Sequence, residues 1–188
     1  MIFTETPIPG LFIIDLEKRE DERGFFARFY CENQFKNHGL EGKIVQINNS
    51  LTKERHTLRG MHYQLPPAAE IRVARCLKGA TYDMSLDLRS GSLTFGKSFG
   101  IELTAENRRM MYIPKGFAHG FMTMEKDTEF LYLVSEFYTL DKERIIRWND
   151  PKFDLKWPYE PKHISEKDSK QTDFDPAWHL QGMDTVSL

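Results

Sequence analysis

Hydrophobic and polar residues alternate with period two along much of this chain. In the segment TYDMSLDLRS (residues 81–90), Tyr82, Met84, Leu86 and Leu88 fall on one face and polar residues on the other. SFGIELT (98–104) repeats the alternation, and further strand candidates are residues 24–30, 43–52, 58–64, 71–77 and 129–138. Turn signals separate these segments, for example at residues 78–79, 90–92 and 114–116. Strands at this spacing, without alternating helices, predict an all-β sandwich or barrel.

The remaining segments indicate little helix and an irregular C-terminal part. One helix is predicted over ENQFKNHGL (32–40), ended by Gly39. From about residue 150 the chain is rich in Pro and Trp, and it then reaches ISEKDSK, where Ser165 precedes Asp168 by three residues. That spacing resembles a capping box at the start of a short helix. We therefore expect residues 1–188 to form one domain, with a tail from about residue 150 that wraps the barrel.

Composition excludes several classes of protein. A chain of 188 residues with 40% hydrophobic and 29% charged residues can bury a core without disulfides. The net charge of −2 does not indicate a nucleic-acid-binding surface. The N-terminal segment lacks a basic stretch and a long apolar run, so we expect neither a signal peptide nor a membrane span. Cys31 and Cys76 have no metal-ligand spacing and are expected to be reduced thiols, which predicts a cytoplasmic protein.

Two histidines lie in distinctive local sequences. LRGMHYQ (58–64) places Arg59, Gly60 and His62 in a predicted strand, and a strand glycine indicates a close approach to its backbone, here expected from a ligand. His119 lies in IPKGFAHGF, whose PxGxxH pattern has the shape of the second cupin motif, a turn that delivers a histidine into a jelly-roll barrel. The HxH of the first cupin motif does not occur. Two imidazoles without a positioned carboxylate predict a barrel that binds no metal.

The candidate chemistry is proton transfer. The chain has no GxSxG elbow, Walker loop or Rossmann glycine fingerprint, so no cofactor is expected. A histidine base, a carboxylate that orients it and a tyrosine acid suit proton abstraction next to a carbonyl, with cations stabilising the oxyanion. The alternative is that both histidines are satisfied polar groups of the core. Five arginines could stabilise the oxyanion or hold a diphosphate, or else form a solvated face: Arg23, Arg28, Arg59, Arg72 and Arg75.

Eight collinear blocks carry a resemblance to a known family. They are PGLFIIDLEKREDERGFF, VQINNS, LRGMHYQ, YDMSLDLRSGSLTFG, ELTAEN, IPKGFAHGF, LYLVSEFYTLDKERIIRWNDP and ISEKD. In this order and spacing the chain resembles the dTDP-4-dehydrorhamnose 3,5-epimerases. The resemblance implies a cupin-type jelly-roll β-barrel with a few short peripheral helices. It also implies a cofactor-independent isomerase that inverts C3 and C5 of a nucleotide-linked 4-keto-6-deoxyhexose in deoxysugar biosynthesis. The alternatives are a sugar-nucleotide 3,4-ketoisomerase and a non-catalytic cupin that binds sugar nucleotides.

The resemblance also assigns roles to individual residues. It implies that His62 is the base and that Tyr132 is the acid on the opposite face. It implies that Asp168 orients His62; the alternative role for Asp168 is helix capping. The residues it implies for holding the diphosphate, sugar and nucleotide are Arg59, His119, Gln46, Asn48, Ser50 and Tyr138. Arg23 and Phe26 match residues that the family supplies from a neighbouring subunit through a swapped N-terminal strand. The resemblance therefore implies a homodimer.

Two positions depart from the family pattern. Arg72 stands where the family usually has a lysine that stabilises the enolate or orients the 4-keto oxygen, so the choice between C3 and C5, or the preferred sugar, could change. Arg28 stands where the family typically has a glutamate near the nucleobase. A carboxylate accepts the N3–H of thymine, whereas an arginine only donates, which suits cytosine. The substrate is therefore expected to be dTDP-linked, by family precedent, or CDP-linked.

Overall fold

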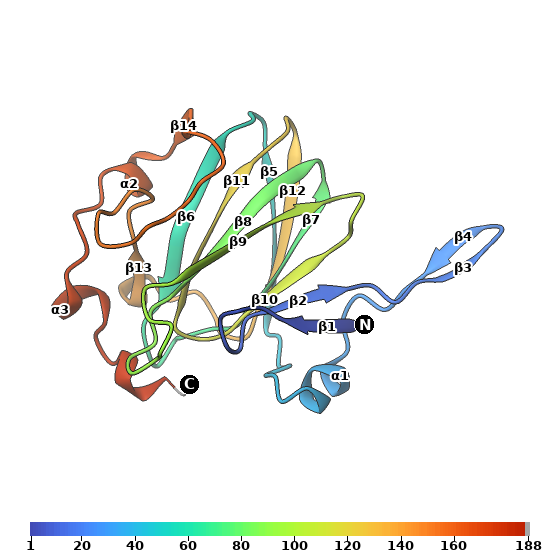
Figure 1. The fold of residues 1–188 in the computed structure, drawn as a ribbon, viewed down its shortest axis with the longest axis horizontal. Coiled ribbons are helices and arrows are strands. Elements are labelled where there is room, and N and C mark those ends of the chain that lie inside the picture. The colour runs from blue at the N-terminus through green and yellow to red at the C-terminus, as the bar shows by residue number, and fades with distance from the viewer. Residues whose placement is uncertain (187–188) are drawn as a thin grey trace.

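The computed structural model describes residues 1–186, and its main strands form two facing β-sheets (Figure 1). The first sheet contains, in spatial order, β1 (Ile2–Glu5), β2 (Phe12–Asp15), β10 (Met110–Ile113), β7 (Arg72–Lys78), β12 (Thr128–Val134) and β5 (Gln46–Thr52). The second contains β13 (Glu143–Ile145), β6 (Thr57–Gln64), β11 (Phe117–Thr123), β8 (Ala80–Asp87) and β9 (Ser98–Thr104). Neighbouring strands within each sheet are antiparallel, and β14 (His163–Ile164) adds to β6 in parallel.

The helices are short and peripheral, as predicted. They are α1 (Glu32–Asn37), α2 (Glu166–Ser169) and α3 (Pro176–His179), with 3-10 turns at Leu140–Lys142 and Met183–Thr185. None of the helices within residues 1–186 has the length and apolar character needed to cross a bilayer. The prediction of an all-β barrel with a few short helices is confirmed.

An apolar core fills part of the space between the two sheets. Ala74, Cys76 and Phe130 come from the first sheet, and Leu103 and Phe121 come from the second. The rings of Phe121 and Phe130 stack across the interior with centroids 4.2 Å apart. Burying such side chains is the main driving force that holds the two sheets together. Burial also raises the pKa of the Cys76 thiol to about 11, so this cysteine is unreactive.

The alternating strand β8 turns its polar face inward and its apolar face outward. Met84, Leu86 and Leu88 lie on the outer face, under a cover that includes Phe153, Phe174 and other residues of the C-terminal segment. The inward residues include Asp83 and Ser85, and both are fully buried. The C-terminal segment thus protects an apolar outer face, and the strand's polar residues become available to line the interior.

The outer face of the first sheet is covered by the N-terminal part of the chain. Phe35 of α1 is fully buried and packs in a cluster with Val73, Tyr112 and Leu133. The helix ends before Gly39, whose φ of +71° suits the left-handed conformation that closes a helix. The predicted helix and its C-terminal glycine are therefore confirmed.

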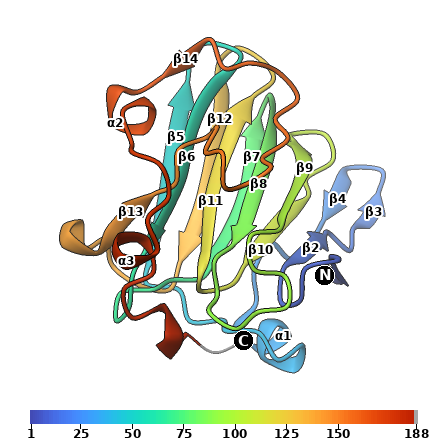
Figure 2. The same cartoon turned by 60° about the vertical axis from the view of Figure 1, so that its left-hand side comes forward.

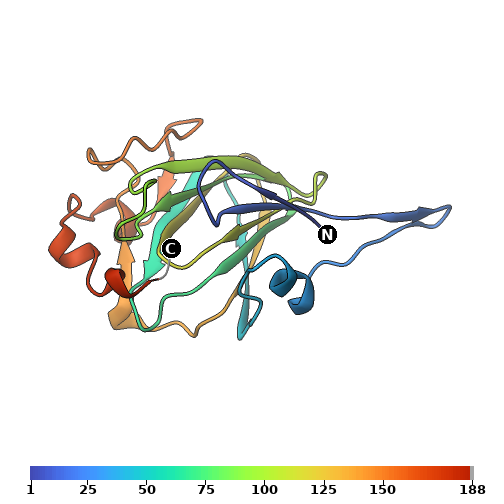
Figure 3. The same ribbon diagram turned by 60° about the horizontal axis from the view of Figure 1, so that its bottom comes forward.

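A two-stranded hairpin projects from the barrel. It consists of β3 (Arg19–Asp21) and β4 (Gly24–Phe26), and it extends away from the body at the end of the long axis opposite to α2 and α3 (Figures 1 and 3). The strand expected over residues 24–30 ends at Phe26, because the chain then leaves the hairpin to reach α1. The hairpin exposes 67% of Phe26, a large apolar side chain.

A buried ion pair fixes one end of the barrel. Arg89 Nη2 donates to Asp87 Oδ2 at 2.8 Å and to the carbonyl oxygen of Pro9 at 2.9 Å, and so ties the β1–β2 turn to the end of β8. The hydroxyls of Ser92 and Thr94 donate to the same carboxylate oxygen, each at 2.7 Å. Burial by itself would raise the pKa of Asp87, but the hydrogen bonds from Arg89, Thr94 and Ser92 outweigh it and lower the pKa.

Candidate active site

A cavity of about 470 Å³ opens between the two sheets, on the side where β5 and β6 contribute to its lining. In Figure 2, α2 lies beside β6 at this side of the barrel. The cavity is lined by Ser50, Thr57, Leu58, Arg59, His62, Arg72, His119, Gly120, Phe121, Tyr132, His163, Ile164, Ser165, Lys167 and Asp168. Polar and charged side chains predominate in this lining, unlike in the neighbouring apolar core.

A second hollow of about 340 Å³ adjoins the first. His62, Arg72 and Tyr132 line both spaces and stand where the two meet. The other residues lining the second hollow are Gln46, Asn48, Glu70, Val134, Glu136, Tyr138 and Glu143. The combined volume suits an elongated polar ligand whose central part lies against the three shared residues.

His62 is paired with a buried carboxylate. Its Nε2 lies 2.7 Å from Oδ1 of Asp168, whose side chain is 5% exposed. Asp168 accepts the Nε2 proton, so the neutral ring keeps its lone pair on Nδ1. The His62 side chain remains 28% exposed, on the wall of the cavity. The pair therefore presents an oriented base to a bound molecule.

The position of Asp168 follows from the local chain path. Ser165 caps α2 by accepting a hydrogen bond from the Asp168 backbone N–H at 3.0 Å, as the sequence predicted. The Asp168 side chain points to β6, where the Gly60 N–H donates to its Oδ2 at 3.3 Å. Burial alone would raise the pKa of Asp168, but the hydrogen bonds and charge of His62, with those from Gly60 and Ser165, lower it. The carboxylate is therefore ionised at neutral pH.

A second histidine–aspartate pair lies deeper in the cavity. His119 Nε2 is 2.9 Å from Oδ2 of Asp83, and both side chains are almost fully buried. Its Nδ1 lies 3.5 Å from Nη1 of Arg72. Arginine can only donate, so Nδ1 is the acceptor and the ring proton sits on Nε2, facing Asp83. His119 and Arg72 together form a polar end of the cavity, in which Arg72 is the cation.

Tyr132 faces His62 from the other sheet. It lies on β12 of the first sheet, next to Phe130 in the inward-facing alternation, whereas His62 lies on β6 of the second sheet. The Arg72 guanidinium carbon is 6.0 Å from the centre of the Tyr132 ring. A molecule bound between the sheets would meet an imidazole on one face and a phenol on the other. Such an arrangement can remove a proton from one face and return one to the opposite face.

Gly60 serves the fold rather than a ligand. Its φ is +122°, and a Cβ there would lie 2.5 Å from Gly120 Cα and 2.7 Å from the His119 carbonyl oxygen. The expectation that a ligand approaches this backbone is wrong, because the neighbouring strand β11 occupies that space. The close approach of β6 and β11 brings His62 and His119 into register.

Two carboxylates, Asp168 and Asp83, are engaged by histidines. Within residues 1–186, no group of three or more His, Cys, Asp or Glu side chains is arranged to hold a metal ion. The carboxylate beside His62 is Asp168, which the resemblance named, whereas the carboxylate beside His119, Asp83, was not indicated by the sequence.

A comparison with models of protein families matches residues 5–175 to the family described as dTDP-4-dehydrorhamnose 3,5-epimerase. The chain belongs to this family. The resemblance carried by the eight sequence blocks is thereby confirmed. The expectation that the chain is an isomerase of the epimerase type, and not a ketoisomerase, is confirmed with it.

Individual epimerases of the family resemble the chain over nearly its whole length. The dTDP-4-dehydrorhamnose 3,5-epimerase of Salmonella typhimurium is 38% identical over 179 residues, which are 94% of this chain and 97% of that protein. The crystal structure of the Elizabethkingia anophelis epimerase has a TM-score of 0.88 and 37% identity, covering 93% of this chain and 96% of the other. The Legionella pneumophila epimerase, solved in complex with dTDP-4-keto-L-rhamnose, has a TM-score of 0.82 and 34% identity, covering 89% of each chain. The predicted cupin-type jelly roll of this epimerase family is confirmed.

Most of the residues that the epimerase resemblance singled out come together at the two adjoining spaces. His62, Arg72 and Tyr132 stand at their junction. Arg59, His119, Ser50 and Asp168 line the larger space, and Gln46, Asn48 and Tyr138 line the smaller one. Gln46, Asn48 and Ser50 alternate along β5 with outward-facing residues, which explains how one strand lines both spaces.

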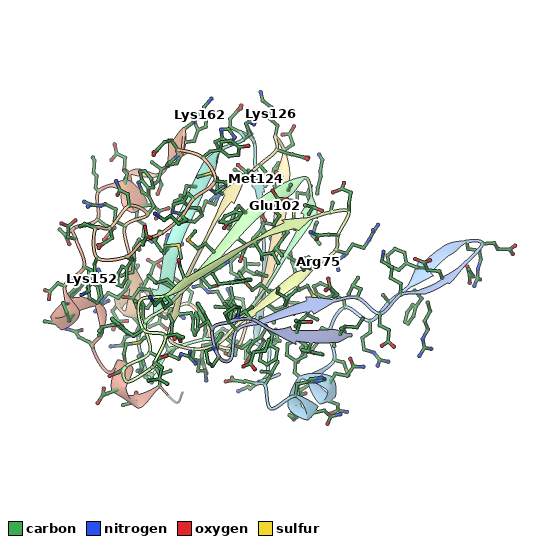
Figure 4. The ribbon with its side chains drawn as sticks, viewed as in Figure 1. Arg75, Glu102, Met124, Lys126, Lys152 and Lys162 are labelled. Atoms are coloured by element: carbon green, nitrogen blue, oxygen red, sulfur yellow. The ribbon has the colours of Figure 1, made fainter. Side chains whose placement is uncertain are left out.

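Four of the arginines and aromatic residues considered from the sequence lie elsewhere. Arg23 and Phe26 are exposed on the hairpin, and Arg28 follows it, beside a small hollow that also involves Met1 and Gln34. Arg75 lies on the outer face of β7, where its guanidinium is 5.1 Å from the Phe29 ring, at the side of the barrel from which the hairpin leaves (Figure 4). Because it lies on the outer face, Arg75 cannot contact a ligand bound in the cavity of the same chain.

Sequence reasoning did not name several charged residues of this candidate site. Glu70 and Glu143 line the smaller space, Lys167 lines the larger one, and Asp83 holds His119. Asp83 could have been found, because it lies on the polar face of an alternating strand that also faces the interior. Lys167 directly precedes Asp168, whereas no pattern in the sequence distinguishes Glu70 and Glu143 from solvent-exposed acids.

Proposed function

We propose that this chain inverts C3 and C5 of dTDP-4-keto-6-deoxyglucose without a cofactor. The observation that carries the proposal is the placement of His62 and Tyr132 on opposite sheets of one cavity, with Asp168 2.7 Å from His62. The Legionella relative was solved with dTDP-4-keto-L-rhamnose, which supports a dTDP-linked 4-keto sugar as the substrate class.

The chemistry follows from the acidity of the C–H bonds next to the 4-keto group. His62 Nδ1 takes the proton from C3 or C5, and the electrons of that C–H bond move into the keto oxygen to form an enolate. Arg72 stabilises the oxyanion with its guanidinium, which His119 Nδ1 helps to hold in place. Tyr132 then donates its hydroxyl proton to the same carbon from the opposite face. Its phenolate and the His62 imidazolium return to their starting states by exchange with water, so each inversion is balanced in protons.

The remaining polar residues suit the nucleotide part of the substrate. Arg59 is a donor on the larger space, where a diphosphate would be held by charge-assisted hydrogen bonds. Gln46, Asn48 and the aromatic ring of Tyr138 line the smaller space and would contact the sugar or the base. We propose a thymine base; cytosine is the alternative, because Arg28 offers donors alone.

We also propose that the protein is a homodimer whose N-terminal hairpins are exchanged. The hairpin carries Arg23 and exposes Phe26, at the end of the barrel far from α2 (Figure 3). An exposed aromatic side chain on a projecting hairpin suits burial against another chain. In that assembly Arg23, Phe26 and Arg28 would complete the partner's site. The two free cysteines, Cys31 and Cys76, suit action in the reducing cytoplasm, which we propose as its location.

The test is deuterium uptake from heavy water, followed by NMR, with dTDP- and CDP-4-keto-6-deoxyglucose. We expect uptake at C3 and C5 and products of inverted configuration, with the dTDP substrate reacting faster. Faster reaction of the CDP substrate would replace thymine by cytosine in the proposal. Uptake at one carbon would restrict the enzyme to one inversion, and the absence of uptake on both substrates would contradict the proposed activity.

A further inference from the structure

Glu70 forms a buried ion pair with Arg72 on the wall of the site. Its Oε1 accepts hydrogen bonds from Arg72 Nε at 2.8 Å and from Arg72 Nη2 at 2.5 Å. The Glu70 side chain is 7% exposed and the Arg72 side chain is 14% exposed. Because both partners are shielded from water, this pair orients the guanidinium far more strongly than a surface ion pair would.

The second oxygen of Glu70 is held as well. Gln64 Nε2 donates a short hydrogen bond to Glu70 Oε2 and a further one to the Phe137 carbonyl oxygen at 3.2 Å. Gln64 Oε1 accepts from the Thr139 backbone N–H at 2.6 Å. Phe137 and Thr139 flank Tyr138, which lines the smaller space. Glu70 therefore joins Arg72 to the loop that carries Tyr138 and cannot rotate without breaking this network.

The opposite edge of the guanidinium faces His119. Arg72 Nη1 lies 3.5 Å from His119 Nδ1, and Asp83 fixes the other ring nitrogen of His119 at 2.9 Å. Glu70 on one side and His119 on the other thus define the plane of the guanidinium. The Arg72 side chain lines the space that it shares with His62 and Tyr132.

We infer that Glu70 is a positioning residue, which sets the plane of Arg72 so that its N–H groups meet the keto oxygen of the substrate. This inference rests on the proposed function. A guanidinium is a planar fork and is effective only in one orientation, whereas a lysine ammonium is a compact charge with freely rotating donors. Positions 70 and 72 are therefore a matched pair: an arginine at 72 requires the carboxylate, and a lysine there would be drawn away from the substrate by it.

The test is a double-mutant cycle with four proteins: wild type, Glu70→Gln, Arg72→Lys and the double variant. Rates of deuterium uptake at C3 and C5 give kcat and KM for each protein. We expect Glu70→Gln and Arg72→Lys each to lower kcat by about 10²-fold, with a smaller change in KM, because a misplaced donor fails mainly in the transition state. We expect the double variant to recover to within about tenfold of wild type, since a lysine without a competing carboxylate can turn to the oxyanion.

The matched control is Asp15→Asn. Asp15 forms a comparable arginine–carboxylate pair with Arg109, on the outside of the barrel, with side chains 35% exposed. Its loss should leave kcat and KM unchanged. The unfolding midpoint of every variant separates an effect on the site from an effect on folding.

Three results would overturn the inference. The first is that Glu70→Gln has the kcat of wild type. The second is that the fold-decrease in kcat of the double variant equals the product of the two single fold-decreases. The third is that Glu70→Gln loses activity only because the protein is unfolded. Failure of the proposed function is a separate result, shown by wild-type protein without deuterium uptake. In that case the Kd of dTDP-4-keto-6-deoxyglucose would be measured for the same four proteins by calorimetry. Losses of binding free energy that are not additive would support the pairing of Glu70 with Arg72, and additive losses would overturn it.

Discussion

Asp168 Oδ1 lies 2.7 Å from His62 Nε2, although the two residues are 106 positions apart in the chain. The contact depends on β14, in which His163 and Ile164 pair in parallel with Thr57 and Leu58 of β6. Ser165 then caps α2 and places Asp168 over the same strand. A short strand and one helical turn thus deliver the carboxylate that orients the His62 ring.

Replacing Asp168 by Asn should lower deuterium uptake at both carbons by about 10²-fold or more, because an amide neither fixes the Nε2–H tautomer nor stabilises the imidazolium. Uptake by NMR measures the effect. Asp173→Asn is the control, since Asp173 lies in the same segment, 62% exposed, and pairs with Arg147. Equal rates for Asp168→Asn and wild type would remove Asp168 from the mechanism.

His62→Ala and Tyr132→Phe should fail in different ways. Without the imidazole no proton is removed, so His62→Ala should lose uptake entirely. Tyr132→Phe should still take up deuterium but form little inverted product, because the donor on the opposite face is missing. NMR separates uptake with retained configuration from inversion. Uptake at the wild-type rate in His62→Ala would reassign the base.

Gly60→Ala should destabilise the protein by about 3 kcal/mol or more, since a Cβ would meet Gly120 and the His119 carbonyl group and the backbone conformation is strained for alanine. Urea unfolding measures the loss. Gly24→Ala is the matched control: its φ of +125° is similar, but nothing lies within 4 Å of the added Cβ. We expect it to cost only about 1–2 kcal/mol, the strain without the clash. Equal losses would show that β11 does not restrict Gly60.

Asp87→Asn should remove about 3–5 kcal/mol of stability at neutral pH, because Arg89 would remain buried without its partner. The folded-state pKa of Asp87 is lowered, so its contribution is complete above the unfolded-state pKa of about 3.9 and is lost as pH falls through the folded-state pKa. The stability difference between wild type and Asp87→Asn should therefore be constant from neutral pH down to that unfolded-state pKa, and shrink in stronger acid. Urea unfolding at a series of pH values measures it, and a difference that grows in acid would contradict this sign.

Mixing two inactive variants should restore activity if the hairpins are exchanged. His62→Ala lacks the base but has an intact hairpin, and Arg23→Ala has the base but a defective hairpin. In a mixed dimer one site combines an intact His62 with an intact hairpin, so random reassociation should restore about a quarter of wild-type activity. Chains mixed without prior dissociation provide the control. A mixture that stays inactive while mixed dimers form would contradict the exchange of hairpins.

The strands that the sequence predicted best are the long alternating ones. Residues 98–104 form β9 with the expected bounds, and the expected strand at residues 58–64 begins one position earlier. The prediction for residues 129–138 extended four positions too far, because β12 ends at Val134 and the chain turns towards Gln64. Alternation of hydrophobic and polar residues indicates which side chains of a strand are buried, but it does not indicate the residue at which the strand ends in a turn.

The site was predictable where a residue has a distinctive local sequence. His62, His119 and Asp168 lie in such segments, and the structure places all three at one cavity. Glu70 has no such signal, because its role depends on Gln64 and Arg72 folding around it. The misinterpretation of Gly60 has a similar cause: a sequence shows that a backbone is approached closely, not which neighbour approaches it.

The cover over the outer face of β8 and the partner of His62 come from one segment of the chain. The segment that hides Met84, Leu86 and Leu88 is the same one that carries Asp168 to His62. A nascent or proteolytically nicked chain without this segment displays an apolar sheet to chaperones and proteases, and at the same time lacks the partner of its base. Under the proposed mechanism, loss of this one segment would remove activity and expose the apolar face at the same time.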